Sequence, residues 1–297
     1  MRVCSKYCRP PIMPMKIPKR IEPLVEEGLV DEVICQLMSG KEAMIYVVRC
    51  GGNIRCAKVY KETNIRSFRK SIDYTEGRRE KNSRRARAME KGTCYGRRAQ
   101  EEAWQSVEVD SLYRLAAAGV RVPQPYNFFE GVLLMELVTD ANGNAAPRLN
   151  DLVPTLEQAR EYHRILVRQV VRMLCAGIVH GDLSKYNVLI GSNGPVIIDL
   201  PQAIDAAGNS SAHSMLLRDM YNLANYFGRF SPELLTTDYG SEIWSLYQSG
   251  KLHPGIELTG RVEHRNKPPN VVGVLRIVEN VLKKEAALQR YQQEMRG

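Results

Sequence analysis

A polar loop followed by two apolar runs is the feature that most constrains this chain. The stretch "VHGDLSKYNVLI" places His180, Asp182 and Asn187 just before an apolar run, and "PVIIDL" ends a second run at Asp199. The turn signal "GSNG" between the two runs predicts an antiparallel hairpin. Because one hairpin would carry both ends of this stretch, we expect Asp182, Asn187 and Asp199 to face one cleft.

These side chains suit phosphoryl transfer. A carboxylate held in a tight loop, such as Asp182, can accept a hydrogen bond from an attacking hydroxyl. The amide oxygen of Asn187 and the carboxylate of Asp199 are oxygen ligands of the kind that Mg²⁺ prefers. Catalysis of phosphoryl transfer is mostly positioning and charge neutralisation at the phosphates. We therefore predict Asp182 as the catalytic residue, and Asn187 and Asp199 as metal ligands.

A kinase interpretation requires further parts in a fixed order, and each has a candidate. A strand lysine for the α- and β-phosphates is found in "CAKVYK", and a helix glutamate that would hold it lies fifty residues on, with Glu101 and Glu102 as weaker alternatives. The turn "SGKEA" would cover the phosphates, and "VLLMELV" would supply the adenine-contacting hinge. The predicted nucleotide-binding residues are Ser39, Gly40, Lys41, Glu42, Ala43, Lys58, Glu108, Met135, Glu136 and Val138.

Strand patterns precede helix patterns along the chain. Alternating apolar residues with "CGGN" and Glu-Gly turns predict strands within 33–56, another at "IRCAKVYK" and two within 120–138, with one amphipathic helix, Glu101–Ala118, among them. Helices are then expected at Thr155–Ala176, with Thr155 as N-cap, and at 214–227, 231–249 and from 271 onward. This order predicts an α+β, reduced two-lobe protein-kinase-like fold, with a small N-lobe of antiparallel sheet plus helix and a mostly helical C-lobe.

The expected organisation has three parts. Residues 1–18 form a flexible, basic, proline-rich arm, residues 19–138 the N-lobe, and residues 139–297 the C-lobe with a helical C-terminal extension. A flexible basic insert is expected at about 61–98, where thirteen Lys and Arg face five Asp and Glu, a balance of +8 that is nearly the whole net charge of +9. Such blocks are solvated and often bind polyanions.

Several kinase signatures are replaced in this chain. It has no G-x-G-x-x-G, HRD is HGD, DFG is "DLP", and no A-P-E follows. With these departures, "SGKEAMIYVV", "AKVYK", "LLMELV", "HGDLSKYNVLI" and "IIDLPQA" resemble the RIO family of atypical protein kinases over roughly Ile21 to Leu246. The basic insert resembles the insert of the first RIO subfamily. The short chain resembles a compact prokaryotic member of the family.

The resemblance implies an ATP- and Mg²⁺-dependent serine kinase, with Mn²⁺ as an alternative ion, that also phosphorylates itself. It implies Lys58, Asp182 and Asp199 as catalytic residues, and Asp199 can in this family also accept phosphate as an aspartyl-phosphate. The implied partners are ATP, a protein substrate including the chain itself, and ribosomal RNA or a pre-ribosomal particle. An ATPase switch that acts in ribosome assembly is therefore an alternative function.

A small-molecule phosphotransferase of the aminoglycoside or choline type is a further alternative, because H-G-D-x-x-x-x-N also occurs there. No apolar run approaches the roughly 20 residues that span a bilayer, and the N-terminus lacks the apolar region of a signal peptide. We therefore expect a cytoplasmic protein with no membrane partner. Its seven scattered cysteines are expected to be free thiols.

Overall fold

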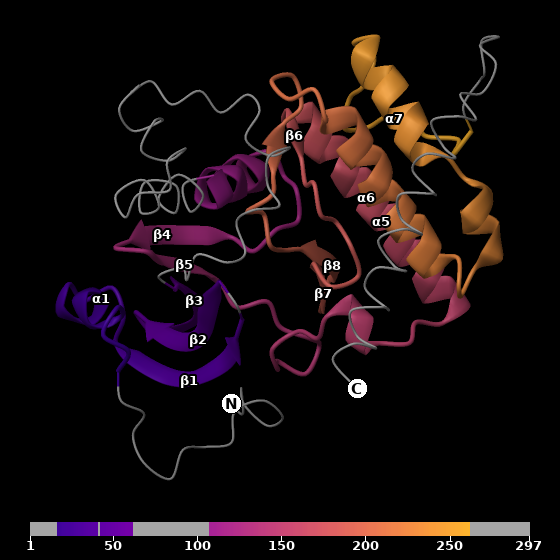
Figure 1. The fold of residues 1–297 in the computed structure, drawn as a ribbon. Helices are drawn as coiled ribbons and strands as arrows, with labels where there is room; N and C mark the ends of the chain where they lie inside the picture. Colours follow the sequence, from indigo (N-terminus) through magenta and orange to yellow (C-terminus); the bar gives the residue numbers. More distant parts are fainter. Residues whose placement is uncertain (1–16, 41, 62–106, 262–297) are drawn as a thin grey trace, which may run out of the picture. The chain divides into compact units, whose positions relative to one another are not determined.

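A computed structural model describes residues 17–40, 42–61 and 107–261, all of them within the structural unit that ends at Arg261 (Figure 1). An antiparallel sheet occupies the N-terminal part of the described chain, and helices dominate the C-terminal part. The expected α+β, kinase-like fold class is confirmed. Within the described residues, no helix is both long and apolar enough to cross a membrane.

The N-terminal sheet is antiparallel throughout, in the order β1-β2-β3-β5-β4. Two of its hairpins have two-residue turns that need positive φ. Gly51 and Gly52 have φ of 56° and 81°, and Glu130 and Gly131 have φ of 46° and 75°, as tight hairpins with right-handed twist require. The strands are β1 Glu32–Ser39, β2 Ala43–Cys50, β3 Asn53–Tyr60, β4 Pro125–Phe129 and β5 Val132–Glu136.

Alternation along β3 gives the sheet two different faces. Ala57 and Val59 are buried in a cluster with Leu24 of the short helix α1, Glu22–Glu26. Residues two apart along a strand point to the same face, so Lys58 and Tyr60 both project from the opposite face. That face carries the polar side chains discussed below.

The helix over 107–117 matches the described part of the predicted amphipathic helix, whose first six residues lie outside the described chain. Val109, Leu112 and Leu115 are buried at helical spacing. The helix ends at Gly119, whose φ of 73° is the left-handed conformation of a C-terminal glycine.

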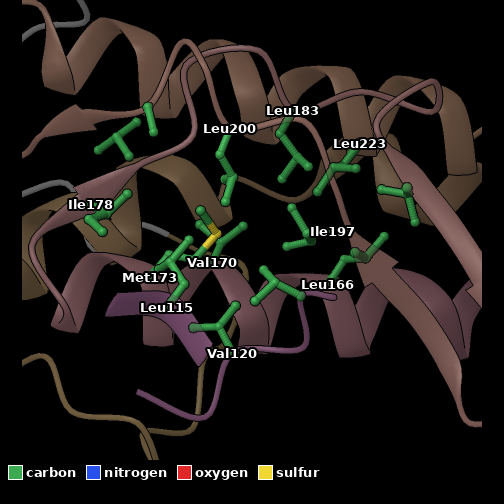
Figure 2. Close-up of a cluster of buried hydrophobic side chains, with 14 of the residues drawn as sticks. Leu115, Val120, Leu166, Val170, Met173, Ile178, Leu183, Ile197, Leu200 and Leu223 are labelled. Carbon is green, nitrogen blue, oxygen red and sulfur yellow. The ribbon is translucent and has the colours of Figure 1, made fainter. Parts of the chain in front are cut away.

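The helical part is built on α5, which packs against α6 and α7 (Figure 1). Thr155 begins α5 with a capping box, in which its hydroxyl accepts from the Gln158 amide. Leu166, Val170 and Met173 project from one side of α5 toward Leu183, Ile197 and Leu200 (Figure 2). The elements are η2 Leu149–Asp151, α5 Leu156–Cys175, β6 Ile178–Val179, β7 Val188–Gly191, β8 Gly194–Ile197, β9 Ile204–Asp205, α6 Ala212–Phe227, η3 Pro232–Thr236 and α7 Tyr239–Gln248.

Two expectations are wrong. The single helix predicted over 231–249 is divided into η3 and α7, because Thr237 is extended and the Asp238 side chain accepts from the Ser241 amide as a new N-cap. Among the described cysteines, Cys50, Cys56 and Cys175 are free thiols, whereas Cys35 is disulfide-bonded. The helix expected from residue 271 lies outside the described residues.

His163 of α5 predicts an acid sensitivity of the fold. The ring is 2% exposed and lies between Phe227 and Tyr239. Burial lowers the pKa of His163 from 6.5 to about 4. The unfolded chain therefore binds more protons between these values, and stability falls as pH decreases from about 6.5 toward 4.

We expect His163→Phe to reduce this pH-dependent loss, by on the order of 3 kcal/mol in the free energy of unfolding. Chemical denaturation at pH 7 and at pH 4.5 measures the difference. His253→Phe, at an exposed position, is the matched control. An equal pH-dependent loss in wild type and His163→Phe would contradict the assignment.

Candidate active site

A cavity of about 480 Å³ brings the predicted nucleotide-binding parts together. Its wall combines the turn after β1, the strands β2, β3 and β5, the helix over 107–117, and the end of the β7–β8 hairpin. Ser39, Asp182 and Asn187 are not among the lining residues, and Lys41 lies outside the described chain. The predicted residues that line it are Gly40, Glu42, Ala43, Lys58, Glu108, Met135, Glu136, Val138 and Asp199.

Lys58 is the centre of a polar cluster in this wall. Its Nζ lies 2.5 Å from Glu108 Oε1 and 3.5 Å from Asp199 Oδ1. The Tyr60 hydroxyl donates to the second oxygen of Glu108 at 2.6 Å. Glu108 is only 4% exposed, so its carboxylate is held from both sides. Tyr60 was not predicted from the sequence, although its position two residues after Lys58 places both on one face of β3.

The charges of this cluster set the protonation of its members. Burial alone would lower the pKa of Lys58, but Glu108 and then Asp199 stabilise the ammonium, and the pKa is raised overall. Burial, followed by the nearby Glu108 carboxylate, raises the pKa of Tyr60. Lys58 is therefore a cation and Tyr60 a neutral donor at physiological pH.

The turn between β1 and β2 is closed by a residue that the sequence analysis did not select. The Gly40 amide donates to the Ala43 carbonyl at 2.9 Å. Lys61, just after β3, donates from Nζ to the Gly40 carbonyl at 2.6 Å and to Ser39 Oγ at 3.0 Å. The Ser39 hydroxyl and the Gly40 carbonyl are therefore both engaged by a neighbouring cation.

At the predicted hinge, Glu136 directs its side chain to an arginine. Its two carboxylate oxygens accept from Arg121 at 2.6 and 2.7 Å, and one of them accepts from the Gln124 amide. Burial would raise the pKa of Glu136, but the bonds from Arg121 and the Gln124 amide, together with the charge of Arg121, lower it overall. A contact between a nucleotide and this hinge would therefore use the backbone of the segment.

The loop that carries Asp182 is folded around His180. The Asp182 amide donates to His180 Nδ1 at 3.2 Å, and His180 Nε2 lies 3.1 Å from the Ile198 carbonyl. Because Nδ1 accepts a hydrogen bond, the neutral ring carries its proton on Nε2 and donates it to Ile198. His180 thus ties the loop of Asp182 to the backbone next to Asp199.

The Asp219 carboxylate of α6 also holds the loop of Asp182 in place, through hydrogen bonds to its backbone. Its two oxygens accept from the Gly181 and Leu183 amides at 2.8 and 2.9 Å, on either side of Asp182. Asp219 is 1% exposed, and burial raises its pKa to about 6. The adjacent Arg218 donates to the Gly181 carbonyl. Asp219 was not predicted from the sequence, although a carboxylate within the apolar stripe of an amphipathic helix is an unusual feature.

Asn187 is oriented so that an oxygen remains for a metal. Its side-chain Nδ2 donates to the Asp182 backbone carbonyl at 2.9 Å, and its backbone carbonyl accepts from the Ile198 amide at 3.0 Å, so neither bond uses the side-chain Oδ1. Asp199 follows at once, with a left-handed φ of 67°. No group of three or more His, Cys, Asp or Glu that could hold a metal occurs within the described residues. One amide and one carboxylate oxygen nevertheless fit Mg²⁺ that is shared with phosphates.

The anchoring by Asp219 yields a prediction about the loop of Asp182. In Asp219→Asn, one oxygen can still accept, but the second backbone amide faces an NH₂ group. We expect a loss of about 2 kcal/mol in the free energy of unfolding and slower phosphate transfer from ATP. Denaturation and a labelled-ATP assay measure the two effects. Asp205→Asn is the control, because Asp205 also accepts from two backbone amides but in an exposed turn. Full activity in Asp219→Asn would contradict the prediction.

Comparison with known proteins identifies the family. The RIO domain model matches residues 44–239. RIO-type serine/threonine-protein kinase Rio1 of Haloferax volcanii is 36% identical over 212 residues, 69% of this chain and 67% of the relative. Rio1 of Methanocaldococcus jannaschii is 31% identical over 199 residues, 67% and 63% of the two chains. Serine/threonine-protein kinase rio1 of Schizosaccharomyces pombe is 29% identical over 219 residues, 72% and 41%.

The aligned part thus spans about two thirds of the two archaeal relatives and less than half of the yeast relative. The resemblance inferred from the five sequence motifs is confirmed by these matches. The chain belongs to the RIO domain family, and the relatives to which it is similar are named serine/threonine-protein kinases.

Proposed function

We propose that this chain transfers the γ-phosphate of ATP, with Mg²⁺, to serine hydroxyls of proteins, including its own. The observation that carries this proposal is the assembly around one cavity of Lys58, paired with Glu108, and of Asp199. The loop of Asp182 is hydrogen-bonded to the backbone beside Asp199 through His180. Mn²⁺ is an alternative ion.

In the proposed reaction, Lys58 binds the α- and β-phosphates, while Asn187 and Asp199 hold the metal. The bound metal supplies charge neutralisation at the phosphates. The serine oxygen bonds to the γ-phosphorus as the bond from that phosphorus to the β,γ-bridging oxygen breaks, and ADP leaves. Asp182 receives the hydroxyl proton. Burial raises the pKa of Asp182, which strengthens the carboxylate as a proton acceptor.

An ATPase switch is the second candidate, and the segment after Asp199 favours it. β9 pairs with β6, and Leu200, Ala203 and Ile204 are buried. This short, fixed segment leaves little chain there for docking a peptide. In such a switch, Asp199 would accept the phosphate as an aspartyl-phosphate, which water would then hydrolyse. A small-molecule phosphotransferase remains a third hypothesis that acceptor screening tests.

The remaining predictions concern partners. The basic insert at about 61–98 and the arm at 1–18 lie almost wholly outside the described residues, so RNA or pre-ribosomal binding stays a prediction. The domain boundaries and the cytoplasmic location also stay predictions. Salt-dependent RNA binding would be expected if the insert neutralises phosphates.

The role of Asp182 predicts a separation of binding from transfer. Asp182→Asn should bind ATP nearly as well as wild type, but phosphorylate itself roughly 10²- to 10⁴-fold more slowly, because the proton acceptor is lost. Incubation with γ-labelled ATP and Mg²⁺, with calorimetry of ATP binding, measures both. Asp205→Asn serves again as the exposed control. Normal autophosphorylation of Asp182→Asn would show that the catalytic assignment is wrong.

The two candidate functions differ in what Asp199→Asn abolishes. In both, this variant should weaken Mg²⁺-dependent ATP binding about tenfold or more, since one metal ligand loses its charge. Acid- and base-stable label on serine, absent from Asp182→Asn, supports the protein kinase. Free phosphate with only a hydroxylamine-sensitive label, absent from Asp199→Asn, supports the ATPase switch. Metal dependence equal to that of wild type would rule out Asp199 as a ligand.

A further inference from the structure

Two buried side-chain nitrogens in the described part of the chain have no hydrogen-bond partner, Arg148 Nε and His163 Nε2. His163 lies among the aromatic rings of the helical core. Arg148 instead lines the cavity of about 480 Å³. An unsatisfied buried N–H is costly, and in a cavity wall it can be satisfied by a ligand. Arg148 therefore points to an acceptor on the molecule that binds there.

The guanidinium of Arg148 has strong donors, and within the described residues its one side-chain hydrogen bond goes to a weak acceptor. Its Nη2 lies 3.3 Å from the Met38 sulfur on β1, and a thioether is a poor acceptor. No carboxylate within the described ranges forms an ion pair with it. The backbone of Arg148 is held by a bridge to Leu189 of β7, and Leu189 also lines the cavity. The guanidinium is thus fixed between the β1 edge of the sheet and the β7–β8 hairpin.

The strand register shows which part of a nucleotide would meet this group. Met38 pairs with Ile45, and Ile45 pairs with Lys58. Strands lie about 4.8 Å apart, so Met38 is two strands, or about 10 Å, from the phosphate-binding Lys58. The hinge at Met135–Val138 would contact the base. The sugar connects base and phosphates, and it is the part left to face the β1 edge.

We propose that Arg148 donates from Nε–H to a ribose hydroxyl oxygen, and so makes the site selective for nucleotides that keep their ribose hydroxyls. The inference rests on the proposed function, because it places ATP in this cavity. A nucleotide without these hydroxyls would leave the buried N–H unpaired. Sites built to hydrogen-bond a hydroxyl reject analogues that lack it.

The test compares ADP with 2′,3′-dideoxy-ADP by calorimetry in the presence of Mg²⁺. Wild type should bind ADP about tenfold or more tightly than the dideoxy analogue. Arg148→Met, which keeps an unbranched apolar side chain against Met38, should bind both with similar affinity, and its affinity for ADP should fall about tenfold. Arg164→Met is the matched control, because Arg164 is exposed on α5 and pairs only with Glu161 among the described residues. Its preference for ADP should equal that of wild type.

Three results would overturn the inference in distinguishable ways. An equal loss of affinity for both nucleotides in Arg148→Met would mean a contact to phosphate rather than to the sugar. Unchanged affinities would mean that Arg148 does not contact the nucleotide. If wild type binds neither nucleotide, the proposed function itself fails, and the inference fails with it. Thermal denaturation of each variant confirms that the comparison is made on folded protein.

Discussion

The buried ammonium group of Lys58 is the constraint on which the rest of the site depends. A cation in the face of a sheet is tolerated only when opposite charges compensate its loss of hydration. Glu108 and Asp199 provide that charge from two other parts of the chain. One cation therefore connects β3, the helix over 107–117 and the end of the β7–β8 hairpin. Removing either carboxylate would leave Lys58 less well compensated, so this cluster positions the elements as well as the charges.

A second constraint acts on the loop of Asp182, which has little regular structure of its own. The backbone amides of Gly181 and Leu183 both donate to one buried carboxylate, Asp219. The side chain of His180, in the same loop, bonds to the Ile198 carbonyl. Buried backbone groups need such partners. The loop is thus held by α6 on one side and by the hairpin on the other, which fixes Asp182 relative to Asp199 without a longer element.

Local signals predicted most of the fold, and long-range contacts account for what was missed. The hairpin turns, the N-cap at Thr155 and the end of a helix at Gly119 depend on a few neighbouring residues, and these predictions were confirmed. Lys61 bonds to a residue 21 positions earlier, Arg148 to one 110 positions earlier, and Asp219 to two that are 36 and 38 positions earlier. Contacts over such separations leave no periodic pattern in the sequence that would indicate the partner. Lys58 and Glu108, which are 50 residues apart, could be predicted as a pair because kinase motifs follow a known order along the chain. That order indicates which distant residues meet.

The charges around the cavity bear on the metal in the proposed reaction. Among its lining residues, Glu42, Glu108, Glu136, Asp151 and Asp199 are acidic, whereas Lys58 and Arg148 are basic. Glu136 is paired with Arg121, and Glu108 and Asp199 both lie against Lys58. Acidic side chains still outnumber basic ones among the described lining residues. A polyphosphate would enter a wall with excess negative charge, and at short range like charges repel strongly in a poorly solvated site. A divalent cation held by Asp199 would offset that repulsion by neutralising charge at the phosphates. The carboxylates of this wall therefore favour the metal–nucleotide complex over the free nucleotide.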